Sequence, residues 1–303
     1  MRNAFIDELV QQARKRPNIA LIVGDLGYSV VEPFSEEFPD RFVNAGVAEQ
    51  NMTGLAAGMA SEGYHVFTYS IANFPTFRCA EQVRNDVDYH RLAVTVVAVG
   101  GGLAYGPLGY SHHAVQDYAL MRSMPNMMIA APGDPHEVRG CMRYLIENPG
   151  PSYLRLGKAG EPTVHASIPE VAPGKWLFLE GHQHSKCAIV STGAAIVYAL
   201  NSLKYDQRNA YAVYSLPLWG MGAKSLQPLS ATRFDEIITF EDHLLDGGFG
   251  SWMMESLVAT KLQSIVTPIA LSREVCGTVG SQSILNEIGG LATRVGASLS
   301  PRK

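Results

Sequence analysis

The run IALIVG at residues 19–24 decides the fold class of this chain. Consecutive apolar residues closed by a glycine are typical of a strand that is buried on both faces of a sheet. Apolar residues with helical spacing precede the run between residues 5 and 13, and a helix of small residues is expected from residue 47. A buried strand between two helices indicates an α/β protein with a mostly parallel sheet.

The alternation of strand-like and helix-like segments continues through the first half of the chain. The expected elements are strands at 66–69, 93–99, 127–131 and 152–156, and helices at 80–89 and 136–147. After residue 157 the pattern dissolves and prolines interrupt it. This change predicts a linker between two domains at residues 161–186.

Alternation resumes in the second half. The expected elements are strands at 188–190, 210–214, 237–240 and 265–271, a helix that ends at 203 and a helix at 251–260. A length of 303 residues is enough for about two domains. We therefore predict two consecutive parallel-sheet α/β domains, at residues 1–160 and 187–303.

Composition and charge argue against several classes of protein. The formal net charge is −4 and no run of Lys or Arg stands out, so no nucleic-acid partner is expected. The first residues lack the apolar core of a signal peptide, and the apolar stretch at 92–99 is too short to span a bilayer. The four scattered cysteines argue against a zinc site or a disulfide framework. We expect a cytoplasmic protein with no membrane partner.

Glu49 lies in the run GVAEQNM at residues 46–52, where a carboxylate opens a helix of small and apolar residues. Acidic side chains are seldom fully buried without a partner. One interpretation is structural, because a helix N-terminus stabilises a negative charge through its dipole and free N–H groups. The other interpretation is a catalytic acid. Taken alone, the residue favours the structural interpretation.

Glycines and histidines follow the strand expected at 93–99. The segment GGGLAYGPLG at 100–109 matches neither a dinucleotide fingerprint nor a phosphate-binding loop, and a mobile loop is the simpler interpretation. Ligands of α/β sheets nevertheless bind at such strand ends. His112 and His113 are adjacent and do not share a face, so a metal site with two histidines is not expected. Each is either a solvated loop residue or a candidate for catalysis or substrate binding.

Aromatic residues cluster after the Glu49 helix, at Phe67, Tyr69, Phe74 and Phe77. Aromatic side chains at such spacing belong more often to a core than to a cofactor pocket. A flat heteroaromatic ring would nevertheless stack well on them, and both interpretations stay open on the residues alone.

Several motifs in one order resemble the C-terminal two-thirds of a transketolase, which is its pyrimidine-binding domain followed by its C-terminal domain. VAEQNM at 47–52 is similar to the segment whose glutamate contacts the aminopyrimidine of thiamine diphosphate. SHHAVQD at 111–117 and MRSMPN at 121–126 resemble the family's His-Gln stretch and Arg-x-x-Pro. EDH at 241–243 with GGFG at 247–250 resembles motifs of the last domain. The resemblance covers nearly the whole chain.

The resemblance implies a role for each candidate residue. Glu49 would share a proton with the pyrimidine ring nitrogen and so be both catalytic and cofactor-binding. Phe74 or Phe77 would stack on the pyrimidine. His112 would contact the substrate or the reacting intermediate, and Lys158 would bind an anionic substrate group. Residues 1–160 would be the pyrimidine-binding domain and residues 187–303 the transketolase C-terminal-like domain.

The chain also departs from family patterns at four places. LGY at 108–110 stands where transketolases carry Asp-Gly-Pro, and Ala72 aligns with the stacking phenylalanine. Lys158 replaces an arginine, which keeps the charge but loses the bidentate fork. The segment GDLG at 24–27 lacks the third glycine of the metal–diphosphate signature and is interpreted as a turn.

The family's diphosphate-binding domain has no counterpart here, so the resemblance implies the smaller, β-type subunit of a split transketolase. A separate N-terminal, diphosphate-binding subunit would hold Mg²⁺ or Ca²⁺, and this chain would contribute no metal ligand. We expect this chain to form a homodimer by itself and a heterotetramer with the partner subunit. The expected substrate is a sugar or sugar phosphate, from which a two-carbon ketol unit passes to an aldose.

Two alternatives remain at this point. One is the β subunit of a 2-oxo-acid dehydrogenase, which shares the two-domain plan, although the histidine and Arg-x-x-Pro-Asn stretches favour transketolase. The other is a non-catalytic subunit that completes a partner's fold, and retention of Glu49 argues against it. A nucleotide dehydrogenase ranks lower, because no dinucleotide fingerprint is present.

Overall fold

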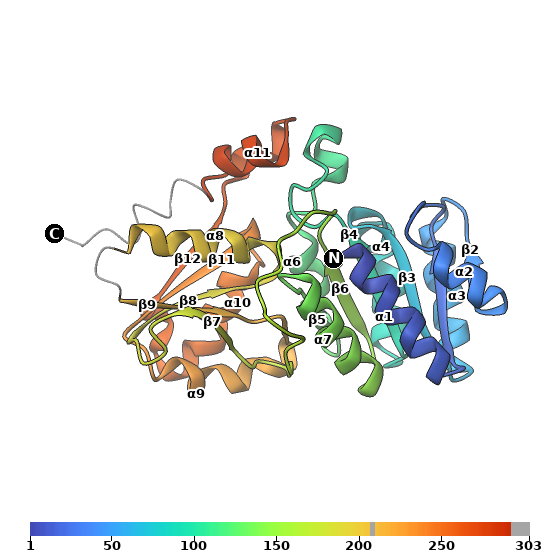
Figure 1. Ribbon diagram of the computed structural model, residues 1–303, viewed down its shortest axis with the longest axis horizontal. Coiled ribbons are helices and arrows are strands. Elements are labelled where there is room, and N and C mark those ends of the chain that lie inside the picture. Colours follow the sequence, from blue (N-terminus) through green and yellow to red (C-terminus); the bar gives the residue numbers. More distant parts are fainter. Residues whose placement is uncertain (207–209, 292–303) are drawn as a thin grey trace.

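The computed structural model describes residues 1–206 and 210–291, which form two sheets lying side by side (Figure 1). The strands of the first sheet are β1 (Ile19–Val23), β2 (Phe42–Asn44), β3 (His65–Ile71), β4 (Val94–Val99), β5 (Met128–Ala130), β6 (Ser152–Leu156) and β10 (Leu218–Gly220). Those of the second are β7 (Leu177–Gly181), β8 (Cys187–Ser191), β9 (Tyr211–Ser215), β11 (Glu236–Leu244) and β12 (Val266–Leu271).

The first sheet has the strand order β10-β5-β6-β4-β3-β1-β2, and the second has the order β12-β11-β8-β9-β7. Neighbouring strands are parallel except for the pairs β10–β5 and β7–β9. The α/β fold class predicted from the alternation of segments is confirmed.

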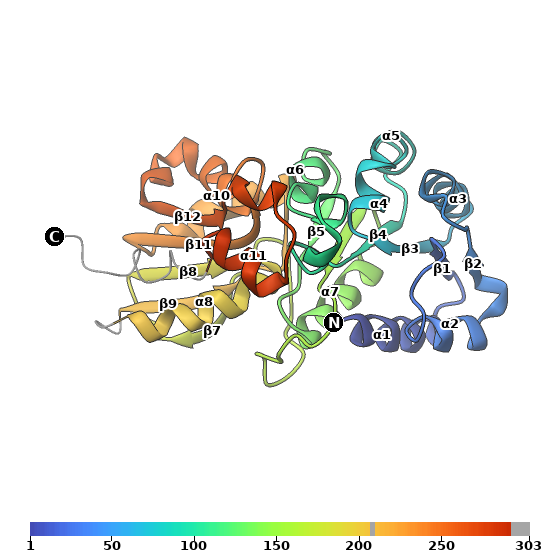
Figure 2. The same ribbon diagram turned by 90° about the horizontal axis from the view of Figure 1, so that it is seen from above.

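Helices cover both faces of each sheet (Figure 2). The α-helices are α1 (Arg2–Lys15), α2 (Glu32–Glu37), α3 (Glu49–Ser61), α4 (Asn73–Phe77), α5 (Ala80–Gln82), α6 (Asp117–Met121), α7 (Pro135–Glu147), α8 (Ile196–Ser202), α9 (Gln227–Ala231), α10 (Phe249–Leu257) and α11 (Gln282–Ile288). The 3₁₀ helices are η1 (Pro39–Arg41), η3 (Gly106–Leu108), η4 (Tyr110–His112), η5 (Gly193–Ala195), η6 (Leu203–Tyr205), η7 (Met221–Leu226), η8 (Val258–Thr260), η9 (Leu262–Ile265) and η10 (Arg273–Gly277).

The side chains of the central strands alternate between two cores. On β3, Phe67 packs with Phe5 of α1 in a core that also includes α2 and α7, whereas Val66 packs with Met52 of α3 on the opposite face. The Val66 core continues into the second sheet as far as Trp252 of α10. A third core lies under α8 and α11 on the other face of the second sheet. In the described ranges, no helix combines the length and the apolar character needed to cross a membrane.

Strands β7 and β10 were not expected from the sequence. Strand β7 lies inside 161–186, the range predicted as a linker, and pairs antiparallel with β9 at one edge of the second sheet. Its sequence LFLEG begins with three consecutive apolar residues instead of an alternation, and only Leu177 is buried. Strand β10 comes from the second half of the chain and pairs with β5 of the first sheet. It is three residues long, too short for a periodic signal.

The helix expected at 80–89 also differs in kind. After α5, residues Val83–Asp88 form a π-helix, η2, in which the N–H of Tyr89 donates to the carbonyl of Arg84. Apolar spacing does not distinguish this wider turn from an α-helix, because Val83 and Val87 are buried in either case. π-Helices are rare and short in proteins.

The segment after β6 is attached to the N-terminus of α7 through Val164 and His165. Asp134 accepts hydrogen bonds from the backbone N–H groups of Glu137, Val164 and His165. Burial opposes ionisation of Asp134, but these bonds and the His165 side chain lower its pKa to about 2. Burial raises the pKa of the neighbouring Glu137 to about 7. The start of the 161–186 range is therefore fixed by buried polar contacts.

A buried arginine joins the two sheets. Arg155 of β6 donates from Nε to Asp117 Oδ2 at 2.7 Å and from Nη1 to Asp242 Oδ1 at 2.5 Å, and Asp242 belongs to β11 of the second sheet. Its Nη2 donates to the carbonyl of Ala114, and its Cζ lies 4.3 Å from the centre of the Tyr118 ring. All three charged side chains are at most 4 % exposed. Such charges are tolerated only because each is paired.

Replacing this arginine is expected to destabilise the whole chain. Arg155→Met leaves two buried carboxylates without their cation, so the free energy of unfolding should fall by about 3–5 kcal/mol. Denaturant titration followed by circular dichroism measures it. The matched control is Arg14→Met, which removes an exposed arginine paired with Glu37 and should change the transition little. Equal midpoints for the two variants would contradict the role assigned to Arg155.

Candidate active site

Glu49 is the first residue of α3, and its carboxylate lies between the carboxyl ends of β1 and β3. The side chain is 1 % exposed. Ser70 of β3 donates from Oγ to Glu49 Oε1 at 3.1 Å. A Cβ atom on Gly24, directly after β1, would lie 3.4 Å from the same oxygen. This is the edge at which open α/β sheets bind their ligands.

Helix α4 brings an aromatic ring and a cation to this carboxylate. Phe74 and Arg78 are four residues apart, so they lie on one side of the helical turn. The Arg78 Cζ atom is 4.2 Å from the centre of the Phe74 ring, and its Nη1 donates to Glu49 Oε2 at 2.8 Å. Phe77 is 48 % exposed. Of the two phenylalanines considered from sequence, Phe74 is thus the one tied to Glu49 through Arg78.

The two adjacent histidines occupy different environments. The His112 ring lies 5.3 Å from the Phe74 ring at an angle of 73°, and its Nδ1 is 2.9 Å from Ser111 Oγ. Burial, His113 and Arg78 all lower the pKa of His112, which favours the neutral imidazole. His113 is only 1 % exposed, and its Nε2 lies 3.2 Å from the Gly106 carbonyl.

Lys158 is linked to His112 through the ring of Tyr105. Its side chain is exposed, with Nζ 5.3 Å from the centre of the Tyr105 ring, and that ring lies 6.4 Å from the His112 ring. Burial raises the pKa of Tyr105, and the nearby Arg2 opposes this shift. Two cationic side chains, Arg2 and Lys158, therefore stand near Tyr105.

Sequence reasoning missed three residues that build this site. Ser70 and Arg78 bind the Glu49 carboxylate. Asn73 donates from Nδ2 to the carbonyls of Ser111 and His113, which fixes the His112 loop against α4. The spacing of Phe74 and Arg78 was a usable signal once α4 was recognised. The contacts of Ser70 and Asn73 are long-range and leave no trace in local pattern.

The Glu-Asp-His and Gly-Gly-Phe-Gly motifs serve the joint between the sheets. Glu241 accepts hydrogen bonds from the N–H groups of Phe249 at 2.6 Å and Gly250 at 2.8 Å, which places its carboxylate at the N-terminus of α10. A Cβ atom on Gly248 would lie 2.1 Å from Glu241 Oε2, so this approach requires glycine. Asp242 pairs with Arg155.

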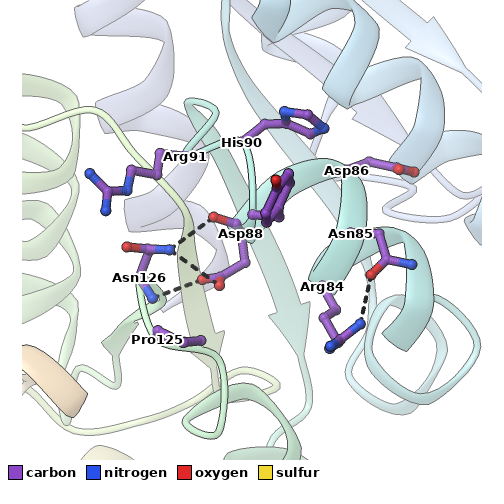
Figure 3. Close-up of a pocket in the computed structure, with 9 residues that line it drawn as sticks. Arg84, Asn85, Asp86, Asp88, His90, Arg91, Pro125 and Asn126 are labelled. Atoms are coloured by element: carbon purple, nitrogen blue, oxygen red, sulfur yellow. Dashed lines mark hydrogen bonds between the residues drawn. The ribbon is translucent and has the colours of Figure 1, made fainter.

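The Arg-x-x-Pro-Asn stretch has structural contacts as well. Arg122 donates to the carbonyl of Gly247 and to Glu255 of α10. The backbone N–H of Asn126 donates to Asp88 Oδ1 at 3.0 Å (Figure 3). The stretch therefore links the loop before β5 to α10 on one side and to η2 on the other.

A surface cavity of about 730 Å³ lies beside this Asp88–Asn126 contact (Figure 3). Its lining consists mainly of exposed polar side chains of η2 and the turn that follows. The lining residues are Arg84, Asn85, Asp86, Asp88, Tyr89, His90, Arg91, Pro125 and Asn126. None of the candidate site residues Glu49, Phe74, Phe77, His112 or Lys158 lines it. The cavity is therefore separate from the candidate site.

Comparison with known proteins identifies the family. The family model described as "Transketolase, pyrimidine binding domain" matches residues 1–161. The chain is 31 % identical to the "Putative transketolase C-terminal section" of Methanocaldococcus jannaschii, with 96 % of this chain and 92 % of that protein covered. It is 32 % identical to a subunit of the apulose-4-phosphate transketolase of Phocaeicola vulgatus, with 84 % and 83 % covered.

A solved transketolase structure has the same fold as this chain. A "Split gene transketolase, inactive beta4 tetramer" superposes with a TM-score of 0.83 and 31 % identity, covering 98 % of this chain and 96 % of that one. The names of these relatives favour transketolase over the β subunit of a 2-oxo-acid dehydrogenase. The chain belongs to the transketolase family and is a β-type transketolase subunit.

Proposed function

We propose that this subunit supplies the pyrimidine half of a thiamine diphosphate site and the substrate-side groups around it. The assembled enzyme would transfer a two-carbon ketol unit from a ketose to an aldose. The observation that carries the proposal is the Glu49 carboxylate, buried at the strand ends within the row formed by Arg78, Phe74 and His112. Family membership implies dependence on thiamine diphosphate.

The side chains at the site fit one half of the cofactor. A buried carboxylate suits a pyrimidine ring nitrogen, and an aromatic face suits the flat ring. The diphosphate half needs a metal and its ligands. Within residues 1–206 and 210–291, no group of three His, Cys, Asp or Glu side chains is placed to hold a metal ion. We assign the diphosphate and its Mg²⁺ or Ca²⁺ to a separate N-terminal subunit.

Each side chain of the row has a distinct task in this proposal. Bound thiamine diphosphate supplies the nucleophilic carbon and the electron sink for cleavage of the ketose carbon–carbon bond. Glu49 holds a proton shared with the pyrimidine nitrogen, and Phe74 supports the ring. Neutral His112 forms a hydrogen bond to a substrate oxygen. Lys158 attracts an anionic group of a sugar or sugar phosphate through its charge, without the bidentate hydrogen bonding of an arginine.

Exposed apolar side chains around the site support docking of the partner. Val47 is 72 % exposed, Leu108 56 % and Tyr110 51 %, and they flank Glu49 and His112 along the chain. Large apolar groups that face solvent usually mark an interface. We infer that the partner covers this face in a heterotetramer and that the chain alone forms a homodimer. The similar split-gene transketolase is, by contrast, described as an inactive β4 tetramer.

We further propose that residues 1–160 form the pyrimidine-binding domain and residues 187–303 the C-terminal-like domain, and that 161–186 connects them and adds β7 to the second sheet. Residues 207–209 and 292–303 of the second range lie outside the described part of the chain. A cytoplasmic location fits the four cysteines, which are widely scattered along the chain with no C-x-x-C pair.

Glu49→Gln is expected to abolish most catalysis in the complex with the partner subunit. Glutamine keeps the size of the side chain but cannot hold the shared proton, so turnover and exchange of the cofactor C2 proton should fall by at least about 100-fold. Stopped-flow quenching with NMR detection measures the exchange. Thermal stability should change little, because Arg78 can turn to solvent. Near-normal turnover would remove Glu49 from this role.

The two histidines should respond differently to substitution. His112→Ala is expected to lower kcat/KM for the ketose by about 10- to 100-fold, because a hydrogen bond to the reacting substrate is lost. Its dissociation constant for thiamine diphosphate should stay within about twofold. His113→Ala should spare kcat/KM and lower the melting temperature, since that ring is buried. The assignment fails if His112→Ala instead abolishes cofactor binding and spares the chemistry.

The isolated chain should bind the complete cofactor poorly. Without the diphosphate half of the site, we expect a dissociation constant weaker than about 10⁻⁴ M for thiamine diphosphate with Mg²⁺, and no ketol transfer. Isothermal calorimetry, repeated after the partner subunit is added, measures both states. Tight stoichiometric binding to this chain alone, or ketol transfer without a second polypeptide, would refute the split-enzyme proposal.

A further inference from the structure

The buried carboxylate of Glu49 needs a partner before any cofactor arrives. An unpaired charge that is shielded from water is strongly unfavourable. In the free subunit Arg78 meets this need, because its Nη1 lies 2.8 Å from Glu49 Oε2 while Ser70 binds the other oxygen. Serine is a neutral donor. Arg78 is therefore the cation that balances Glu49 while the pyrimidine site is empty.

The same guanidinium covers the ring that is assigned to the pyrimidine. The Arg78 Cζ atom lies 4.2 Å from the centre of the Phe74 ring. Stacked rings have centroids about 4.5–7 Å apart, so a pyrimidine on this face would occupy the space that the guanidinium fills. One side chain thus holds both contacts that the pyrimidine requires, the carboxylate and the aromatic face.

We propose that Arg78 is a latch on the pyrimidine site, which the aminopyrimidine of thiamine diphosphate must displace from both Glu49 and Phe74. This inference rests on the proposed function, which assigns those two residues to the cofactor. Arg78 is free to leave, since it follows the last residue of α4 and its side chain is 47 % exposed. Its departure leaves no buried acceptor unpaired, because the pyrimidine nitrogen takes its place at the Glu49 carboxylate.

A latch and a merely structural residue make opposite predictions. A structural contact that persists in the holoenzyme should weaken both the free chain and the cofactor complex when it is removed. A latch stabilises only the free chain, because the cofactor replaces it. Loss of Arg78 should therefore destabilise the free subunit and, by linkage, tighten cofactor binding.

The experiment is a calorimetric titration of thiamine diphosphate, with Mg²⁺, into the complex of this chain with its partner subunit. Arg78→Ala should lower the dissociation constant by about fivefold, which equals about 1 kcal/mol. The melting temperature of the free chain should fall by about 2 °C. Arg78→Lys keeps the charge but loses the planar guanidinium, so its dissociation constant should lie between those of the wild type and Arg78→Ala.

Arg84→Ala is the matched control. It removes an exposed arginine six residues farther on, whose guanidinium donates to Asn85, and so it tests the general loss of positive charge. Its dissociation constant for the cofactor should equal that of the wild type. An Arg78→Ala complex that binds thiamine diphosphate as tightly as the wild type, or more weakly, overturns the latch.

Glu49→Gln in the same titration tests the proposed function separately from the Arg78 latch. If Glu49 binds the pyrimidine, this variant binds the cofactor more weakly, and the gain from Arg78→Ala shrinks in the double variant because no carboxylate charge is left to compete for. An unchanged dissociation constant in Glu49→Gln would count against the proposed function itself. A weaker Glu49→Gln combined with no gain from Arg78→Ala would reject the latch alone.

Discussion

The pairing of Arg155 with two buried aspartates is the constraint on which the rest of the structure depends. It fixes β6 of the first sheet to β11 of the second, and it also explains the glycine-rich segment between β4 and the histidines. A Cβ atom on Gly101 would lie 2.6 Å from Arg155 Nε, and one on Gly102 would lie 2.3 Å from Asp242 Oδ2. The glycines let the backbone pass the ion pair, and the same backbone continues to His112. The position of the substrate-side histidine is thus tied to the joint between the sheets.

Much of the fold was predictable because parallel strands buried on both faces are continuous apolar runs. IALIVG at 19–24 and the β-branched run of β4 need no tertiary information to be read. Strands β7 and β10 were missed for the opposite reason, since pairing partners distant in sequence stabilise them rather than their own pattern. Within the site, Glu49 and His112 came from motif resemblance. Arg78 was missed because its role depends on a hydrogen bond to Glu49, which is 29 residues away in the sequence.

The buried charged groups at the joint and at the candidate site differ in the environment of their partners. Arg155, Asp117, Asp242 and Glu241 are enclosed, and their partners are fixed side chains or backbone N–H groups. Glu49 is equally buried, yet its cation stands half in solvent. Permanent pairs suit a joint, whereas an exchangeable partner suits a carboxylate that must later face a ligand. The difference between the joint and the site therefore lies in the mobility of the counter-ion rather than in burial.

Strand β10 has a consequence for how this protein can be divided. Although the family model ends at residue 161, the sheet of that region is completed only by Leu218–Gly220, whose Trp219 also lies in the core shared by both halves. A fragment cut after 161 would present the edge of β5 as unpaired backbone, open to pairing with another chain. A chimera that takes its C-terminal part from a relative would import a foreign strand into its N-terminal sheet. The unit that recombines in sequence is thus not the unit that folds in space.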